Sequence, residues 1–524
     1  MTAPLRKAAG VAAVVGALAL VLSGCTGSPS SNSSGSPAAK DTAITIAQVG
    51  EPAASQTDPC DDENAGTFMH NNVVQALTDL DPKSGNVIPL LSTSWKQTDP
   101  TTWTFTLRKG VKFQDGTPFN AAAAVYGINR DLNNTKIACS DTAKLSSGVK
   151  VTPTAIDATT LQLKTNVPDP ILPREMAYMD IVSTKIPADQ QTVKPVGTGP
   201  FTWDSWVSGQ YYLLKAWSGY WGKKPQASSV KVIFRPDATV RANSVTTGEA
   251  DMAMGILPQN AQSGANYKAV TFPLGSTVFY RLSLQTPPLN DIRVRQAVQY
   301  ALNKKQITKS LMQGIGTPTG QMIVSSVAGY DPDYKAPAYN LAKAKSLLAD
   351  AKAAGVPVDT QITLVGQTNQ FTNSDEVVQG VLSNLQAAGL NVKLQTVDAA
   401  QWKTLLFKPF PADQAPMILQ TFHKNVSGDA ASSFSSYLAS SSCCGTAKDP
   451  TIDSLLSKGL QQSGDEREAT FRKISDEEYT KDISVVPLAE VSAIMLISNR
   501  ISYQPNVLTQ TNELLLSDIK VTGK

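Results

Sequence analysis

The chain has few histidines, cysteines and charged side chains. Two histidines and five cysteines occur among 524 residues, and charged residues make up 17% of the chain, against about 25% in typical globular domains. This scarcity leaves little scope for histidine-rich metal centres or for catalysis with an imidazole base. The 46 basic and 43 acidic residues give a net charge of only +3, so no nucleic-acid partner is indicated.

Familiar catalytic signatures are also missing. The chain contains no Gly-x-Ser-x-Gly, His-Glu-x-x-His or P-loop pattern. Ser-x-x-Lys occurs at Ser147–Lys150 and Ser228–Lys231 without the other motifs of that enzyme class, so the match is expected by chance. A Ser-His-Asp triad would have only His70 or His423 as its base. We therefore predict that the protein is not an enzyme and needs no cofactor.

The one long apolar run lies at the N-terminus. Arg6 and Lys7 precede an Ala-, Val- and Leu-rich run that ends in Leu22-Ser23-Gly24-Cys25. This order is typical of a secretory signal, and its last residues resemble the bacterial lipobox. We predict a signal peptide over residues 1–24 and a lipid-modified Cys25 that anchors the protein to the bacterial cell membrane, on its extracytoplasmic side. The alternative is an uncleaved anchor with an incidental cysteine.

Residues 25–42 are expected to be a tether. Thr26–Lys40 is rich in Ser, Gly and Pro, with too few apolar side chains to offset the entropy of ordering. Such a segment is flexible and spans roughly 20 Å.

Four cysteines remain after lipidation, and they allow three pairings. We favour a disulfide between Cys60 and Cys139, because it closes a long loop and would stabilise the fold by on the order of 4 kcal/mol. Cys443 and Cys444 are adjacent, and either form a vicinal disulfide or remain thiols. No Cys-x-x-Cys pair is present, so we predict no metal site.

The body of the chain reads as mixed α/β. Ile44 and Ile46 indicate a strand, and the alternation from Trp103 to Leu107, with a turn at Lys109-Gly110, predicts a hairpin that returns through Val111 and Phe113. Helices are predicted over 121–130, capped by Asn120, and around 294–302, capped by Asn290 or Asp291. Another is predicted over 341–354.

A βαβ unit is predicted near the middle of the chain. Apolar strands over 362–365 and 392–397 flank a helix over 376–388 that ends at Gly389. Such a unit implies a parallel sheet, and the loops at the carboxyl ends of its strands can form a ligand crevice.

Several long segments of the chain have a distinctive order. They are VQALTDLDPKSGNVIPLLSTSW (74–95), WTFTLRKGVKFQDGTPFNAAAAVYGINR (103–130), GTGPF (197–201) with GYW (219–221), DATVRANSVTTGEAD (237–251) and LNDIRVRQAVQYALNKKQI (289–307). Together they resemble the solute-binding proteins of ABC importers for oligopeptides, dipeptides and nickel, the extracellular family 5 type. The resemblance covers essentially the whole body.

This resemblance implies an α/β fold of the two-lobed periplasmic-binding-protein type (type II, cluster C), with an extra domain inserted in lobe one. The expected lobe one comprises 43–67, 186–282 and 486–524, the insert 68–185, and lobe two 283–485. Hinges are expected near 281–284 and 484–487.

The resemblance also implies the function. A monomer would capture a small solute or short peptide between two closing lobes and deliver it to the permease subunits of an ABC importer, since ligand contacts with both lobes favour the closed state. The rival prediction is a secreted lipoprotein hydrolase, and a third is a chaperone-like or structural lipoprotein.

Peptide-binding relatives neutralise the ligand's ammonium with an Asp in a motif that matches Leu419–Phe434 here. Phe422 takes the aromatic position, but Asn425 stands in place of that Asp, beside Lys424. A buried ammonium without a carboxylate partner costs several kcal/mol. Ordinary peptides are therefore doubtful, and a neutral or anionic solute is favoured. Asp429 substitutes only if the local alignment slips.

The predicted ligand-binding residues come from three loops. Phe422, His423, Lys424 and Asn425 belong to the first, although the simpler interpretation of His423 is an exposed or structurally satisfied loop histidine. Polar residues after a lobe-two strand form the second. The third follows the first strand of lobe one, where the alternative is plain solvation. The members of the second and third loops are Gln367, Thr368 and Asn369, and Glu51 and Gln56.

Overall fold

The computed structural model describes residues 42–61, 68–82, 84–133, 136, 139, 145, 148–410, 415–425, 427–505 and 514–522, apart from the side chains of Ser55 and Gln56. They belong to the compact unit Thr42–Lys524. The expected signal peptide, Cys25 and the tether as far as residue 41 lie outside the described residues.

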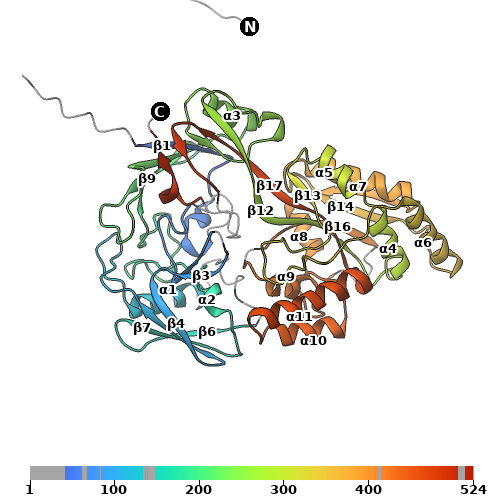
Figure 1. Ribbon diagram of the computed structural model, residues 1–524, viewed down its shortest axis with the longest axis horizontal. Helices are drawn as coiled ribbons and strands as arrows, with labels where there is room; N and C mark the ends of the chain where they lie inside the picture. The colour runs from blue at the N-terminus through green and yellow to red at the C-terminus, as the bar shows by residue number, and fades with distance from the viewer. Residues whose placement is uncertain are drawn as a thin grey trace, which may run out of the picture. The chain divides into compact units, whose positions relative to one another are not determined.

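Within this part of the chain, eleven strands form one mixed sheet (Figure 1). Its main path runs β15-β14-β16-β12-β17-β11-β1-β10-β9-β8, and β13 pairs with β17. The N-terminal half of the sheet contains β1 (Ile44–Gln48), the strand expected at Ile44, between its parallel neighbours β10 (Ser229–Phe234) and β11 (Met252–Ala253). The antiparallel hairpin of β8 (Phe201–Val207) and β9 (Tyr211–Ala216) extends it.

The two faces of this half-sheet pack differently because side chains alternate along each strand. Ile44, Ile46 and Val232 belong to a core with Phe201 and Tyr212. Ala47 and Ile233 point to the other face, where α3 (Ala238–Thr246) covers them. Asp237 caps α3 by accepting from the Val240 amide at 2.8 Å.

Two long antiparallel strands, β12 (Tyr267–Leu282) and β17 (Val485–Ser498), connect the two halves of the sheet. Residues 267–273 of β12 pair with β17 alone, whereas residues 276–282 also pair with β16 (Met417–Lys424). Between these stretches the register shifts, and Gly275 adopts a φ of 63°. A bulge of this kind bends the strand locally.

The other half of the sheet contains the predicted βαβ unit, which is confirmed. β14 (Ile362–Gln367) pairs in parallel with β15 (Val392–Val397), and α7 (Ser374–Ala388) connects them. Gly389 ends α7 with a φ of 101°, a conformation that costs glycine little. Three further helices pack with α7 in one hydrophobic core. They are α4 (Ile292–Ala301, capped by Asp291), α5 (Lys304–Ser310) and α6 (Leu341–Ala353), and α4 and α6 are the helices predicted around 294–302 and over 341–354.

A second core covers the opposite face of β14, β16 and the end of β12. Phe279, Leu419 and Phe434 are all fully buried in it. Four helices and the segment around Met322 contribute to or flank this core. They are α8 (Ala399–Leu406), α9 (Ala430–Tyr437), α10 (Pro450–Gly459) and α11 (Gly464–Glu477).

A separate four-stranded sheet, in the order β4-β5-β7-β6, lies within the expected insert. Helix α1 (Ala121–Asn133) packs on it, and Asn120 accepts from the Ala123 amide at 3.0 Å, so the predicted helix and cap are confirmed. The bounds of the remaining insert elements are β2 (Thr78–Leu80), β3 (Val87–Pro89), β4 (Ser92–Asp99), β5 (Thr102–Leu107), β6 (Val151–Ala155), β7 (Thr160–Thr165) and α2 (Leu172–Glu175).

The hairpin predicted over Trp103–Phe113 is wrong. β5 pairs with β4 on one side and β7 on the other, so both of its edges are occupied. The segment after the Lys109-Gly110 turn closes on itself instead, through a bridge between Lys112 and Pro118. The alternation identified the strand correctly, but not its partner.

Short contacts hold the segments together. Disulfides join Cys60 to Cys139, the pair favoured from the sequence, and Cys443 to Cys444. Buried Arg130 of α1 donates to both carboxylate oxygens of Asp58, at 2.9 and 2.6 Å.

No helix among the described residues meets the length and hydrophobicity needed for a membrane span. The short elements not yet named are β13 (Gly316–Pro318), β18 (Ile501–Ser502) and β19 (Lys520–Val521).

Candidate functional site

The predicted lobe-two residues lie at the ends of two neighbouring parallel strands. Phe422, His423 and Lys424 end β16, and Gln367 ends β14. Gln370 connects the two loops by donating to Gln367 at 3.4 Å and accepting from Gln420 at 3.5 Å. The fold therefore brings these two predicted loops together.

Phe422 and His423 nevertheless point to opposite faces of β16, as adjacent strand residues must. The Phe422 ring stacks on Phe371, with 5.8 Å between the ring centroids. The His423 ring contacts Phe279 and Tyr437 edge-on, at centroid distances of 6.0 and 5.1 Å. These two side chains do not share one binding surface.

His423 belongs to a hydrogen-bonded chain. Its Nε2 lies 2.7 Å from the Ser433 hydroxyl, which donates to Asn425 Oδ1 at 3.3 Å. Asn425 in turn donates from Nδ2 to the Gly275 carbonyl at 3.2 Å. Burial lowers the pKa of His423 to about 4, so the ring is neutral near pH 7.

The loop after β16 offers no free carboxylate to a ligand. Asn425 is 2% exposed, and its amide already bonds Ser433 and Gly275. Asp429 forms a buried two-pronged ion pair with Arg467, with both N–O distances 2.9 Å, and it also caps α9 through the Ala431 amide. Asp429 therefore does not replace the aspartate of peptide-binding relatives.

The other predicted loop residues are partly solvated. Lys424 is half-buried and lies opposite Ser276 of β12. Thr368 and Asn369 are exposed, and the Asn369 amide donates to Asp375 at 3.2 Å. Thr368 and Asn369 therefore lie at the solvent-exposed surface of the loop that follows β14.

Glu51 lies in a different environment. Its Oε2 accepts from Ser208 at 3.1 Å and from the Gly209 amide at 2.8 Å, at the turn between β8 and β9. It lines a cavity of about 460 Å³ with Trp203 and Trp206, none of whose lining residues comes from the β14 or β16 loops. The predicted Gln56 side chain lies outside the described residues.

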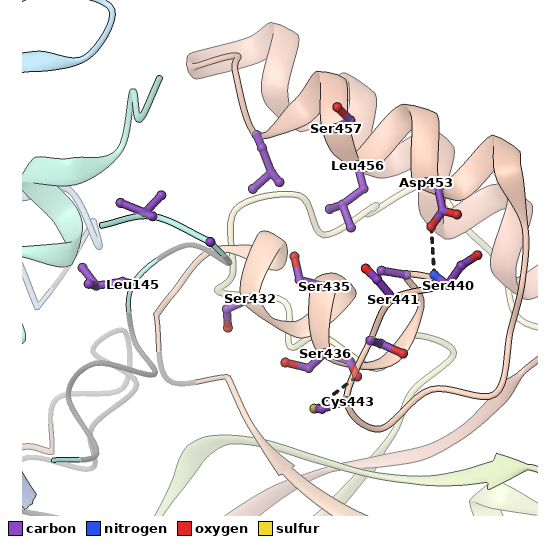
Figure 2. A pocket seen from close by; sticks show the side chains of 15 residues that line it. Leu145, Ser432, Ser435, Ser436, Ser440, Ser441, Cys443, Asp453, Leu456 and Ser457 are labelled. Carbon is purple, nitrogen blue, oxygen red and sulfur yellow. Dashed lines mark hydrogen bonds between the residues drawn. The ribbon is translucent and has the colours of Figure 1, made fainter. Parts of the chain in front are cut away.

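A larger cavity of about 770 Å³ lies beside α9, and we call it the serine pocket (Figure 2). One wall is α9 with the loop that follows it, and α10 forms another. Three residues of the expected insert complete it. The lining residues are Leu145, Gly148, Val149, Ser432, Ser435, Ser436, Ala439, Ser440, Ser441, Ser442, Cys443, Asp453, Leu456, Ser457 and Leu460.

Helical periodicity explains how α9 serves both the core and the pocket. Ser433 and Tyr437, four residues apart, face His423. Ser432, Ser435 and Ser436 occupy the other side and line the pocket. These serines were not predicted from the sequence, although seven serines among residues 432–442 are a visible signal.

Arg281 of β12 holds the pocket's disulfide loop in place. Its guanidinium donates to the carbonyl oxygens of Leu405, Leu406 and Cys444 at 2.7, 2.7 and 2.6 Å. Burial lowers the pKa of Arg281 to about 10, which leaves it charged at neutral pH. The loop that carries the Cys443–Cys444 disulfide is therefore attached to β12 through Arg281, and its residue Cys443 lines the serine pocket.

Glu490 is a further residue of this region that was not predicted from the sequence. It is the single charged residue in the apolar strand β17. It lies opposite Thr277 of β12, which in turn lies opposite His423 of β16, so all three side chains occupy one face of the sheet. Burial raises the pKa of Glu490, and its carboxylate accepts from the Ser325 amide at 3.2 Å.

One group among the described residues has the spacing of metal ligands. Atoms of Cys60, Asp131 and Cys139 lie within 4.8 Å of one another. Both sulfurs are bonded to each other in the disulfide, and a metal requires the thiolate instead. This group therefore serves the fold.

Comparison with known proteins gives a consistent result. The nickel-binding periplasmic protein of Escherichia coli K12 is 29% identical over 338 residues, which cover 59% of this chain but only 63% of that protein, less than two thirds of its length. The glutathione-binding protein GsiB of the same strain is 29% identical over 383 residues, covering 70% of this chain and 71% of its own.

A solved structure supports the fold. The ABC transporter substrate-binding protein CtaP of Listeria monocytogenes superposes with a TM-score of 0.79 at 19% identity, covering 92% of this chain and 100% of its own. This likeness confirms the expected α/β fold of the two-lobed, type II periplasmic-binding-protein class. Because the model of bacterial extracellular solute-binding proteins, family 5 (middle region), matches residues 86–442, well over half of the sequence, the chain belongs to that family.

Proposed function

We propose that this protein is the extracytoplasmic solute-binding component of an ABC importer. It captures one small solute between two lobes and presents it to a permease. The observation that carries the proposal is the serine pocket, because its walls come from the insert, at Leu145 to Val149, and from lobe two, at α9 and α10. A ligand that touches both walls favours their approach by its own binding free energy.

The long strands β12 and β17 supply the connection on which such movement depends. The bulge at Gly275 separates residues 267–273, which pair only with β17, from residues 276–282, which join β16 of lobe two. We propose that the change of lobe falls at this bulge on β12 and at the facing residues of β17, before the boundary expected at Leu282, because residues 276–282 also pair with β16. Otherwise we retain the expected division into lobe one, insert and lobe two.

The test uses the mature protein purified from its native host. Mass spectrometry of a denatured sample identifies the retained small molecule. Small-angle scattering then compares the stripped protein with the protein reloaded with that molecule. We expect a smaller radius of gyration and a higher melting temperature in the loaded form. Identical scattering profiles and melting temperatures with every molecule added would contradict the proposal.

A hydrolase remains the rival function, because Ser433 and His423 lie at the 2.7 Å spacing of a nucleophile and its base. Three features oppose that function. Ser433 has no exposed surface, its hydroxyl also bonds Asn425 Oδ1, and the low pKa of His423 makes the ring a weak base. Stoichiometric labelling of Ser433 by a fluorophosphonate would establish the hydrolase, and an unlabelled protein that binds solute would exclude Ser433 as a nucleophile.

A further inference from the structure

The charges around the serine pocket point to an uncharged ligand. None of its lining residues is Lys, Arg or His, and its one ionisable group is Asp453. Asp453 already accepts from the Ser440 amide at 2.8 Å. The nearby Lys408 does not line the pocket, and its ammonium donates to two residues of the wall, to the Ser440 carbonyl at 3.3 Å and the Ser442 hydroxyl at 3.5 Å.

The hydroxyl groups of the pocket wall are available to a ligand. Among the described residues, no hydrogen bond engages the hydroxyls of Ser432, Ser436, Ser441 or Ser457, all of which line the pocket. The Ser435 hydroxyl is buried and also has no partner there. A serine hydroxyl donates one hydrogen bond and accepts others, so this wall can pair with groups that do both.

Other classes of ligand fit this wall less well. A carboxylate or phosphate finds no cation among the lining residues to offset its desolvation. A peptide ammonium finds a single carboxylate, Asp453, one oxygen of which already accepts from the Ser440 amide. The loop after β16 offers it only Asn425 and the ion-paired Asp429. A purely apolar molecule leaves the serine hydroxyls without partners, which costs free energy.

We propose that the serine pocket binds a neutral polyhydroxylated solute of the carbohydrate class. The hydroxyls of the ligand pair with the serines of α9, while Leu145, Leu456 and Leu460 cover the apolar faces of its rings. A volume of about 770 Å³ lies within the range of roughly 300–1,000 Å³ found for small-molecule sites. This inference rests on the proposed solute-binding function and narrows its substrate class.

The test is isothermal titration of the mature, ligand-stripped protein. The probes are cellobiose, maltose, trehalose, xylobiose, a di- to pentapeptide library, glutathione and nickel chloride, each also assayed by thermal shift. We expect binding of at least one disaccharide at micromolar affinity or better. Replacing Ser435 and Ser436 together by Ala should weaken that binding about tenfold or more, since each lost hydrogen bond contributes roughly fivefold.

The matched control is Ser454→Ala, because Ser454 is an exposed residue of α10 that does not line the pocket. The affinity of this variant for the disaccharide should equal that of the wild type. Circular dichroism checks that each variant is folded. Binding of peptides, glutathione or nickel with no disaccharide binding overturns the carbohydrate assignment but leaves the solute-binding function intact. Disaccharide binding that the double variant does not weaken overturns the serine pocket as the site. An absence of binding by every probe, together with unchanged scattering profiles for the molecule retained from the host, overturns both proposals.

Discussion

At the residue scale, the loop after β16 is shaped by one buried ion pair. Asp429 and Arg467 are each 3% exposed, and Asp429 also caps α9. Removing one partner from a buried pair leaves an uncompensated charge. We expect Asp429→Asn, which keeps the cap but not the charge, to lower the free energy of unfolding by roughly 3–5 kcal/mol. Urea denaturation monitored by circular dichroism measures this loss.

The matched control is Asp359→Asn. Asp359 pairs with Lys352 at 2.7 Å, but both side chains are well exposed, so its loss should leave the unfolding curve nearly unchanged. If both variants lose the same free energy of unfolding, the buried Asp429–Arg467 ion pair contributes no more to stability than an exposed pair does.

His423 gives the second prediction at this scale. Its pKa falls from an ordinary 6.5 to about 4 in the folded protein, so between these pH values the unfolded chain binds a proton that the folded chain does not. Stability from this residue is therefore present above pH 6.5 and lost as the pH falls toward 4. Urea unfolding at pH 7, 6, 5 and 4 should show a steeper loss for the wild type than for His423→Gln.

Parallel pH curves for the two proteins would show that His423 does not titrate in this way. The other histidine, His70, is present in both proteins and cancels in the comparison.

At the element scale, the sequence GTGPF marks a place where two segments touch backbone to backbone. A Cβ at Gly199 would lie 2.6 Å from the Asn72 carbonyl oxygen, and one at Gly197 would lie 2.4 Å from that of Val73. Gln114 closes the contact by donating to the carbonyls of Val73, Gly199 and Phe201, at 3.1, 3.2 and 2.7 Å. This explains why glycine occupies both positions.

We expect Gly199→Ala to lower the free energy of unfolding by about 1–3 kcal/mol, because backbone atoms must shift to admit the methyl group. Thermal and urea unfolding measure the change. Gly50→Ala is the matched control, since nothing lies within 4 Å of a Cβ there, and it should match the wild type. A Gly199 variant as stable as the Gly50 variant would refute the close packing.

At the scale of the whole molecule, the expected lipid anchor at Cys25 and the proposed solute-binding function belong to different parts of the chain. Cys25 lies outside the described residues, so its role rests on the sequence pattern Leu22-Ser23-Gly24-Cys25. In the native host, we expect Cys25→Ser to abolish incorporation of labelled palmitate into the protein, because the Cys25 thiol is the expected attachment site. Ser30→Ala, in the tether, should leave the labelling unchanged. Autoradiography of the immunoprecipitated protein measures the label, and a Cys25 variant that is still labelled would contradict lipidation.

The purified Cys25→Ser protein should bind solute as tightly as the mature wild type, because Cys25 precedes the compact unit Thr42–Lys524. Titration with the molecule retained from the native host tests this independence. A weakened affinity would mean that the N-terminal segment takes part in capture.

The sequence by itself determined the class of fold and some of the regular elements, since these follow from local periodicity and capping. The α7 helix between β14 and β15, and the caps Asn120 and Asp291, are such cases. It also identified the family, because the matching segments are distributed along the chain. Only the tertiary structure decided the partners of β5, the engagement of Asn425 and Asp429, and the gathering of the α9 serines with α10 and the insert. Hydrogen bonds and burial depend on residues far apart in the chain, so they cannot be predicted from local sequence spacing.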